Sequence, residues 1–242
     1  MSLLMQHSRI VGTIVIVSAV SALALITGCR VIESRRLVGA SVPYEQTGTG
    51  PAVVIFGDST AEGTGSSDPR ESIAGRLGLR WPNTPIINRG RDGAKLADIA
   101  AQIEAMPTLA LRLIVIMGGG NDIIAARSIA DLESDLTRVL NSGKRLNAPM
   151  IFMGAGNVGS SPMFPWPVST LVSHRARQAQ AVFDRVTARM AVTRINLFFE
   201  PADDPFLTDA KRFFASDGLH PSGDGYGLWS EKLYSATRDL GG

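Results

Sequence analysis

The stretch Pro51-Ala52-Val53-Val54-Ile55-Phe56-Gly57-Asp58-Ser59-Thr60 decides the fold of this chain. It opens with a short run that is apolar on both faces and ends at Gly57, a pattern typical of a buried strand in a parallel sheet. Because Ser59 follows directly after this strand, we expect the strand to carry the serine to the edge of the sheet.

Four further apolar runs follow, and helical patterns separate them. The runs cover residues 84–88, 112–117, 148–153 and 193–198, and amphipathic patterns cover residues 95–106, 128–143, 167–190 and 222–239. Another helix is expected to start at Asp68, because Pro69 and Glu71 are typical of a first helical turn. Five strands that alternate with helices predict a three-layer α/β/α sandwich with a five-stranded parallel sheet.

Four polar segments, far apart in the chain, contain the residue types that an acyl-transfer site needs. They are residues 57–60, 88–93, 119–122 and 217–220. Ser59 follows the first predicted strand, Gly93 the second and Asn121 the third. Since ligands of such sheets bind outside the carboxyl ends of the strands, we expect these segments to meet in one crevice.

Each segment has a catalytic and a structural interpretation. Ser59 is predicted to be the nucleophile, His220 the base and Asp217 the group that orients the base. The backbone amides of Ser59 and Gly93 and the side chain of Asn121 are predicted to donate to the oxyanion. Taken singly, each segment also has an ordinary structural role. These roles are a helix cap for Ser59, a turn before a proline for Asp217 and His220, a turn glycine for Gly93 and a loop asparagine for Asn121. Their joint presence favours catalysis.

Histidine is scarce in this chain, which narrows the choice of base. The chain has only three histidines, and His7 lies in the leader. His174 lies in a predicted helix beside Arg175, where a solvent-exposed position is expected. His220 is therefore the predicted base.

These segments resemble the SGNH hydrolases, also called the GDSL esterases and lipases. Ser59 matches the first family block, with Thr60 in place of the leucine, and Asn121 matches the third. Asp217 and His220 match the fifth, and Gly93 matches the second, where Gly90 competes with it. The resemblance covers residues 51–240. It implies a flavodoxin-like SGNH hydrolase fold and a serine esterase that needs no cofactor and no metal.

Length and charge limit the other classes of function. A chain of 242 residues is long enough for one domain and an N-terminal appendage. The net charge of +2 gives no reason to expect a nucleic-acid partner. A single cysteine, Cys29, excludes an intrachain disulfide. The sequence predicts no oligomeric state.

The N-terminal segment has the features of a membrane tether. Residues 10–28 contain no charged side chain. As a helix they would measure about 28 Å, close to the bilayer core of about 30 Å. Residues 25–29 (LITGC) also resemble a bacterial lipobox, which would make Cys29 the lipidated first residue.

Residues 1–29 are therefore expected to be a lipoprotein signal peptide or an uncleaved anchor, and residues 30–50 a tether to a domain of residues 51–242. Both alternatives predict a catalytic domain outside the cytoplasmic membrane.

Two other patterns favour structural roles. Residues 154–159 (GAGNVG) match the G-x-G-x-x-G dinucleotide motif, but no helix is predicted to start there, so a nucleotide site is not expected. The following loop contains Met163, Phe164 and Trp166, which are predicted either to line an acyl pocket or to pack against the sheet. Asp58 and Asp122 are expected to make local hydrogen bonds.

The prediction is thus a serine esterase that acts on a lipid or an O-acylated glycan of the cell envelope. One alternative is a non-catalytic envelope lipoprotein that binds glycan or lipid. Another is an O-acyltransferase, because the same acyl-enzyme serves hydrolysis and transfer.

Overall fold

A five-stranded parallel sheet organises the chain. The computed structural model describes residues 21 and 23–238 of the protein. The strands are β1 (Ala52–Gly57), β2 (Ile86–Gly90), β3 (Leu111–Gly118), β4 (Met150–Gly154) and β5 (Thr193–Asn196). Their spatial order is β2-β1-β3-β4-β5, and every pair is parallel. This arrangement confirms the predicted parallel sheet and its flavodoxin-like order.

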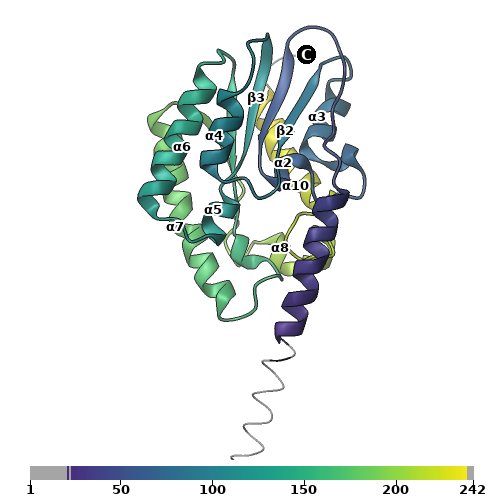
Figure 1. Cartoon of the computed structure of the whole chain (residues 1–242), viewed down its shortest axis with the longest axis vertical. Helices are drawn as coiled ribbons and strands as arrows, with labels where there is room; N and C mark the ends of the chain where they lie inside the picture. Colours follow the sequence, from purple (N-terminus) through teal and green to yellow (C-terminus); the bar gives the residue numbers. More distant parts are fainter. Residues whose placement is uncertain (1–20, 22, 239–242) are drawn as a thin grey trace, which may run out of the picture.

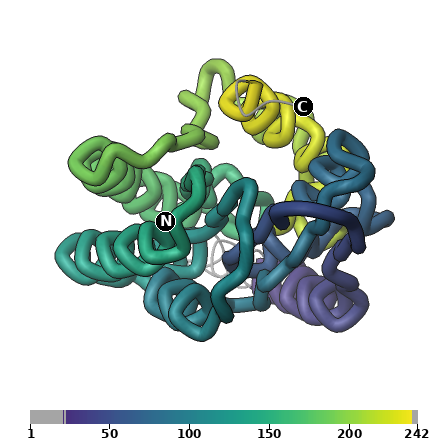
Figure 2. The backbone as a smooth tube through the Cα atoms, turned by 90° about the horizontal axis from the view of Figure 1, so that it is seen from above, coloured from purple at the N-terminus to yellow at the C-terminus, as the bar shows by residue number. Residues whose placement is uncertain are grey.

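Helices cover both faces of the sheet (Figures 1 and 2). They are α2 (Ser59–Glu62), α3 (Ile73–Arg80), α4 (Leu96–Glu104), α5 (Gly120–Ile124), α6 (Ile129–Lys144), α7 (Val168–Arg189), α8 (Pro205–Thr208), α9 (Ala210–Phe213) and α10 (Gly223–Ala236). Helices α4, α6 and α7 pack on one face, whereas α3 and α10 pack on the other. The predicted three-layer sandwich is confirmed.

Alternating side chains of the strands supply two separate cores. On one face Phe152 packs edge-on against Phe183 of α7, with ring centroids 5.3 Å apart. On the other face Val115 belongs to a cluster with Leu77 of α3 and Tyr226 of α10. Because both faces are covered, β1 is buried at every residue, as expected for an apolar strand in the middle of a parallel sheet.

The helix expected at Asp68 starts later than predicted. Asp68 caps only a single 3₁₀ turn, η1 (Pro69–Glu71). Ser72 then accepts a hydrogen bond from the amide of Gly75 and begins α3. Asp68 and Ser72 are both capping residues, and each caps its own helical turn. The longer helix begins at Ser72 because the apolar face of α3 starts there.

Residues 30–50, expected to form an irregular tether, are partly structured. Residues 23–40 form one continuous helix, called here the N-terminal helix. Further along, Gln46 pairs with Ile86 in an antiparallel bridge. The helix continues because Glu33, Arg35, Arg36 and Leu37 are good helix formers and no proline occurs before Pro43. The folded part of the chain therefore begins before residue 51.

The uncharged stretch of the leader falls largely on residues 1–20 and residue 22, outside the described part of the chain. Within the described part, none of the helices combines the length and the apolar character needed to cross a bilayer.

Two leucines of α3 test how the helix is held on the sheet. Leu77 is fully buried, whereas Leu79 is 63% exposed. We expect Leu77→Ala to lower the free energy of unfolding by about 2–5 kcal/mol through lost apolar contacts and a residual cavity. The matched variant Leu79→Ala should change it by no more than about 0.5 kcal/mol. Urea denaturation measures both, and equal losses would contradict this packing.

Candidate active site

Ser59 is the first residue of α2 and follows β1 after a single intervening residue. That residue, Asp58, caps the helix: its Oδ1 accepts hydrogen bonds from the Thr60 amide at 2.9 Å and the Thr60 hydroxyl at 2.6 Å. Burial raises the pKa of Asp58, and the bonds from Thr60 oppose that rise. Asp58 thus makes the local hydrogen bonds expected of it, and these hold Ser59 at the end of the strand.

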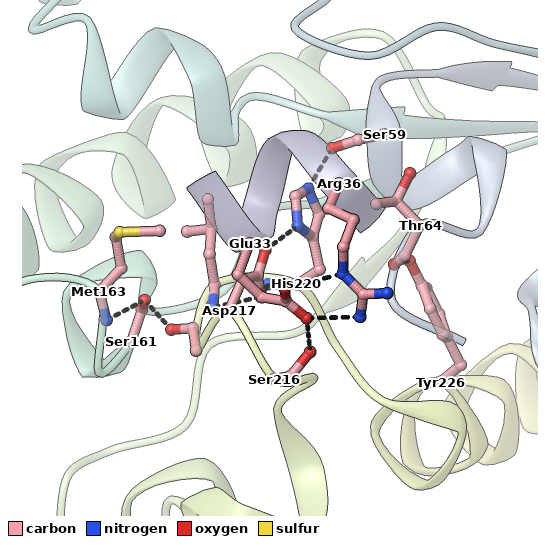
Figure 3. Close-up of polar contacts among 12 residues, drawn as sticks. Glu33, Arg36, Ser59, Thr64, Ser161, Met163, Ser216, Asp217, His220 and Tyr226 are labelled. Atoms are coloured by element: carbon pink, nitrogen blue, oxygen red, sulfur yellow. Dashed lines mark hydrogen bonds and ion pairs between the residues drawn. The ribbon is translucent and has the colours of Figure 1, made fainter. Parts of the chain in front are cut away.

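The structure brings Ser59, His220 and Asp217 together in one hydrogen-bonded chain (Figure 3). His220 Nε2 lies 3.0 Å from Ser59 Oγ, and His220 Nδ1 lies 2.6 Å from Asp217 Oδ2. All three side chains are buried or nearly so. Since a carboxylate holds one imidazole nitrogen, the other nitrogen is left facing the hydroxyl, as a base requires.

The carboxyl group of Asp217 is kept ionised against the effect of burial. Burial by itself raises the pKa of Asp217, because the charged form loses its hydration. The hydrogen bond and charge of His220, together with the amides of Leu219 and His220, outweigh this effect. The pKa of Asp217 therefore lies below its ordinary value.

The loop that carries Asp217 and His220 is closed on itself. The amide of Ala215 donates to the His220 carbonyl at 2.8 Å, and Phe214 pairs with Pro221 in an antiparallel bridge. From the neighbouring loop, the hydroxyl of Ser161 donates to the Gly218 carbonyl. These bonds fix the conformation of the loop that carries Asp217 and His220.

The predicted oxyanion donors line the same pocket as Ser59 and His220. Within the described chain, the backbone amides of Ser59 and Gly93 donate to no other backbone group. One N–H of the Asn121 side chain donates to the Ala94 carbonyl at 3.1 Å. An amide nitrogen carries two hydrogens, so Asn121 keeps a second donor.

The structure separates the two competing glycines, Gly90 and Gly93. Gly90 ends β2, and a side chain there would collide with the backbone nitrogen of Glu62. Gly93 has a positive φ of 69°, open space around its Cα and a place in the pocket wall. Gly90 therefore serves close packing, whereas Gly93 faces the pocket.

Side chains tie the site loops to one another. Glu62 of α2 accepts a hydrogen bond from the amide of Asp92, which fixes the loop that contains Gly93. Asp122, next to Asn121, accepts one from the amide of Leu96. Asp122 thus makes a structural hydrogen bond, but to a segment 26 residues away rather than the local one expected of it. Because both bonds cross between loops, Ser59, Gly93 and Asn121 are held as one unit.

A pocket of about 540 Å³ opens beside Ser59 and His220. Its walls are mainly apolar and come from the ends of several strands and from the C-terminal segments. The apolar members include Met117, Met153, Val158, Leu197, Phe199, Phe206, Phe214 and Trp229. The volume and composition suit an organic ligand of moderate size.

The N-terminal helix forms another wall of this pocket, which the sequence analysis missed. Ser34, Arg35 and Val38 line the pocket. Glu33 pairs with Arg36 and accepts a hydrogen bond from the Ser216 hydroxyl at 2.6 Å (Figure 3). Ser216 precedes Asp217, so the helix touches the loop that carries Asp217 and His220. The available signal was the lack of a proline between the leader and Pro43.

Of the other candidate residues, His174, Met163, Phe164 and Trp166 do not line the pocket. His174 is exposed on α7. Of the loop residues with two alternatives, Met163 is buried, Phe164 packs against the core and Trp166 is 78% exposed. Gly154 and Gly156 precede a single 3₁₀ turn, η2 (Val158–Ser160), rather than a helix, and Gly156 and Val158 line the pocket. Among residues 21 and 23–238, no three His, Cys, Asp or Glu side chains are grouped to hold a metal ion.

The comparison with protein families gives one match. A family model described as the GDSL-like lipase/acylhydrolase family matches residues 55–228, which is more than half of the chain. A comparison with curated proteins found no significant match.

Solved structures with a similar fold are distant in sequence. A crystal structure from Lactobacillus plantarum has 20% identity and a TM-score of 0.66, over 78% of this chain and 96% of that one. A lipase/acylhydrolase from Enterococcus faecalis has 20% identity and a TM-score of 0.58, over 78% and 95%. AlinE4, described as an SGNH-hydrolase family esterase, has 25% identity and a TM-score of 0.53, over 80% and 96%.

The lowered pKa of Asp217 predicts a pH-dependent contribution to stability. Such a group stabilises the fold above its unfolded pKa of about 3.9, and the contribution disappears as pH falls through the folded pKa. We therefore expect Asp217→Asn to destabilise the protein near neutral pH, by an amount that shrinks as the pH falls below about 3.9. Urea denaturation across this range measures the difference, with the exposed Asp203→Asn as control. A loss independent of pH would contradict the assignment.

Proposed function

The chain belongs to the GDSL-like lipase/acylhydrolase family and is a carboxylic ester hydrolase, and we propose that Ser59, His220 and Asp217 are its catalytic residues. The observation that carries this proposal is the continuous chain of hydrogen bonds from Ser59 through His220 to Asp217, at the wall of an apolar pocket. The reaction is acyl transfer through a covalent acyl-enzyme.

The first half of the reaction forms the acyl-enzyme. His220 Nε2 takes the proton of Ser59 as Oγ attacks the ester carbonyl. Asp217 stabilises the resulting imidazolium by its negative charge. The lowered pKa of Asp217 keeps this carboxylate charged. The protonated His220 then gives its proton to the departing alcohol.

The second half repeats these steps with water. His220 removes a proton from water, the hydroxide attacks the acyl group, and Ser59 recovers its proton on release of the acid. In both halves the carbonyl oxygen becomes negatively charged. The Ser59 amide, the Gly93 amide and the Asn121 side chain are the donors proposed to stabilise that charge.

The pocket supports an ester with an apolar acyl chain. Its methionine, leucine and aromatic side chains remove apolar surface from water when such a chain enters. A small acetyl group on a glycan would fill little of a pocket of about 540 Å³. Of the two substrate classes that the sequence leaves open, the lipid ester is therefore the one we propose.

We place the enzyme at the outer side of the cytoplasmic membrane. The uncharged residues 10–28 and the lipobox-like residues before Cys29 support an N-terminal tether in either of its two forms. Cys29 is exposed on the N-terminal helix, where a lipid chain would have room. The positive charges of Arg30, Arg35 and Arg36 lie just after the apolar stretch.

The substitution Ser59→Ala tests the proposed nucleophile. We expect it to lower the hydrolysis of p-nitrophenyl acetate and p-nitrophenyl decanoate by at least about 10⁴-fold, because no acyl-enzyme can form. Ser235→Ala, an exposed serine of α10, is the matched control and should retain full activity. A fluorophosphonate should label the wild-type chain at Ser59.

The relative rates on the two esters and the labelling of the wild-type chain also distinguish the alternative functions. Faster hydrolysis of the decanoate than of the acetate supports a lipid ester, and the reverse ratio supports a deacetylase. A wild-type chain that is inert and unlabelled would instead make the non-catalytic binding lipoprotein the better explanation. Product analysis with an added sugar or alcohol acceptor separates hydrolysis from O-acyl transfer.

The substitution Asn121→Ala tests the oxyanion donors. Loss of a side-chain donor that acts only in the transition state should lower kcat by about 10²–10³-fold and change KM little. Asn141→Ala, on the exposed face of α6, is the control. Because Asn121 also binds the Ala94 carbonyl, the unfolding temperature of the variant must be measured alongside. An unchanged kcat in a folded variant would remove Asn121 from the proposed site.

A further inference from the structure

Exposed apolar side chains of this protein gather at the end of the sheet where the pocket opens, called here the site end. Six large ones follow the carboxyl ends of β3, β4 or β5: Ile124, Ile129, Trp166, Val168, Leu171 and Leu207. Further exposed ones lie on the N-terminal helix, including Leu25, Ile26 and Ile32. Elsewhere among the described residues only Val42 and Leu79 are comparable. Such a one-sided distribution marks an interaction surface.

The N-terminal helix is docked on the site end, which fixes the direction in which residues 23–40 leave the domain. Ser34 and Val38 line the pocket, and Glu33 binds Ser216 next to the catalytic loop. From this contact the helix extends beyond the end of the sheet where α5 and α8 lie (Figure 1). The tether therefore leaves the domain from the face on which the pocket opens.

Both proposed forms of the tether put the bilayer surface at the same level of this helix. An apolar span ends at residue 28, and a lipidated chain would begin at Cys29. Ser34, in the pocket wall, is five residues further on, which is about 8 Å along a helix. The pocket is thus about one and a half helical turns from the lipid.

The charges and the aromatic residue at this level fit a lipid surface. Arg30, Arg35 and Arg36 lie at the start of the docked part of the helix, where anionic headgroups attract them. Trp166 is 78% exposed at the site end, and tryptophan is enriched at the boundary between water and lipid. Apart from Trp166, the exposed apolar residues of the site end lie on four different helices, α5, α6, α7 and α8.

We propose that the site end lies against the bilayer, with Trp166, Leu171 and Leu207 in the headgroup region and the pocket open to the membrane. The enzyme then draws its ester directly from the lipid phase. This inference rests on the proposed function and on the membrane tether. Beyond those two proposals, it states how the domain is oriented on the membrane and which side chains hold it in that orientation.

The first test separates membrane contact from chemistry. The full chain, reconstituted in vesicles of phosphatidylcholine and phosphatidylglycerol, is compared with the triple variant Trp166→Ser, Leu171→Ser, Leu207→Ser. None of these residues lines the pocket. We expect hydrolysis of a long-chain p-nitrophenyl ester dissolved in the bilayer to fall by at least about fivefold, because apolar surface that enters the lipid is lost. Hydrolysis of p-nitrophenyl acetate in water should be unchanged.

Leu79→Ser is the matched control for the triple variant, because Leu79 is 63% exposed on α3, away from the site end. It should leave both rates unchanged. Equal rates of the triple variant and this control on the bilayer substrate would overturn the proposal, provided that both unfold at the wild-type temperature.

A second readout does not depend on activity. Phospholipids brominated near the headgroup should quench part of the tryptophan fluorescence of the wild-type chain, and Trp166→Phe should remove that quenchable part. The other two tryptophans, Trp81 and Trp229, are buried or half-buried. Equal quenching of the wild type and Trp166→Phe would overturn the orientation and leave a protein partner to cover this face.

The two tests also distinguish the proposals from each other. An inert wild-type chain whose Trp166 is quenched would refute the proposed reaction but retain the membrane-facing surface. An active chain whose Trp166 is not quenched would do the opposite.

Discussion

The parallel pairing of β1 with β2 on one side and β3 on the other is the constraint on which the site depends. Each residue of β1 is buried, and its last residue, Gly57, lies in register with Gly90 and Met117. The connections from β1 and β3 leave the sheet on opposite sides, which opens a crevice between them. Ser59 and Asn121 enter this crevice from the two strands, and Gly93 from the neighbouring β2.

Buried carboxyl groups hold the loops around this crevice together, and the structure shifts their pKa values in different directions. Asp58 and Asp122 accept hydrogen bonds from backbone amides, and burial raises the pKa of both. Asp217 also accepts backbone amides, but its partner His220 brings the pKa below the ordinary value. A buried carboxylate with a lowered pKa needs a cationic or strongly donating neighbour, and here that neighbour faces Ser59. The electrostatics thus separate the proposed catalytic carboxylate from two structural ones.

The N-terminal helix connects the proposed chemistry with the proposed location of the enzyme. It lines the pocket with Ser34 and Val38, and its Glu33 contacts the loop of Asp217 through Ser216. A flexible linker would let the domain tumble over a membrane, whereas a docked helix holds the pocket at a fixed position relative to residues 23–40. The proposed substrate access and the proposed membrane attachment therefore depend on one element.

The sequence by itself determined the sheet, its flanking helices and the residues that meet at the site. Strand runs are short and apolar, and their order along the chain places Ser59, Gly93 and Asn121 at strand ends; His220 was singled out because so few histidines exist. Only the tertiary structure shows that Gly93 faces the pocket and Gly90 does not, since α2 packs directly against Gly90. It also decided that residues 23–40 form a helix against the pocket, and that Trp166 faces outwards. Those outcomes depend on contacts between segments far apart in the chain, such as Glu33 with Ser216, which local sequence patterns do not encode.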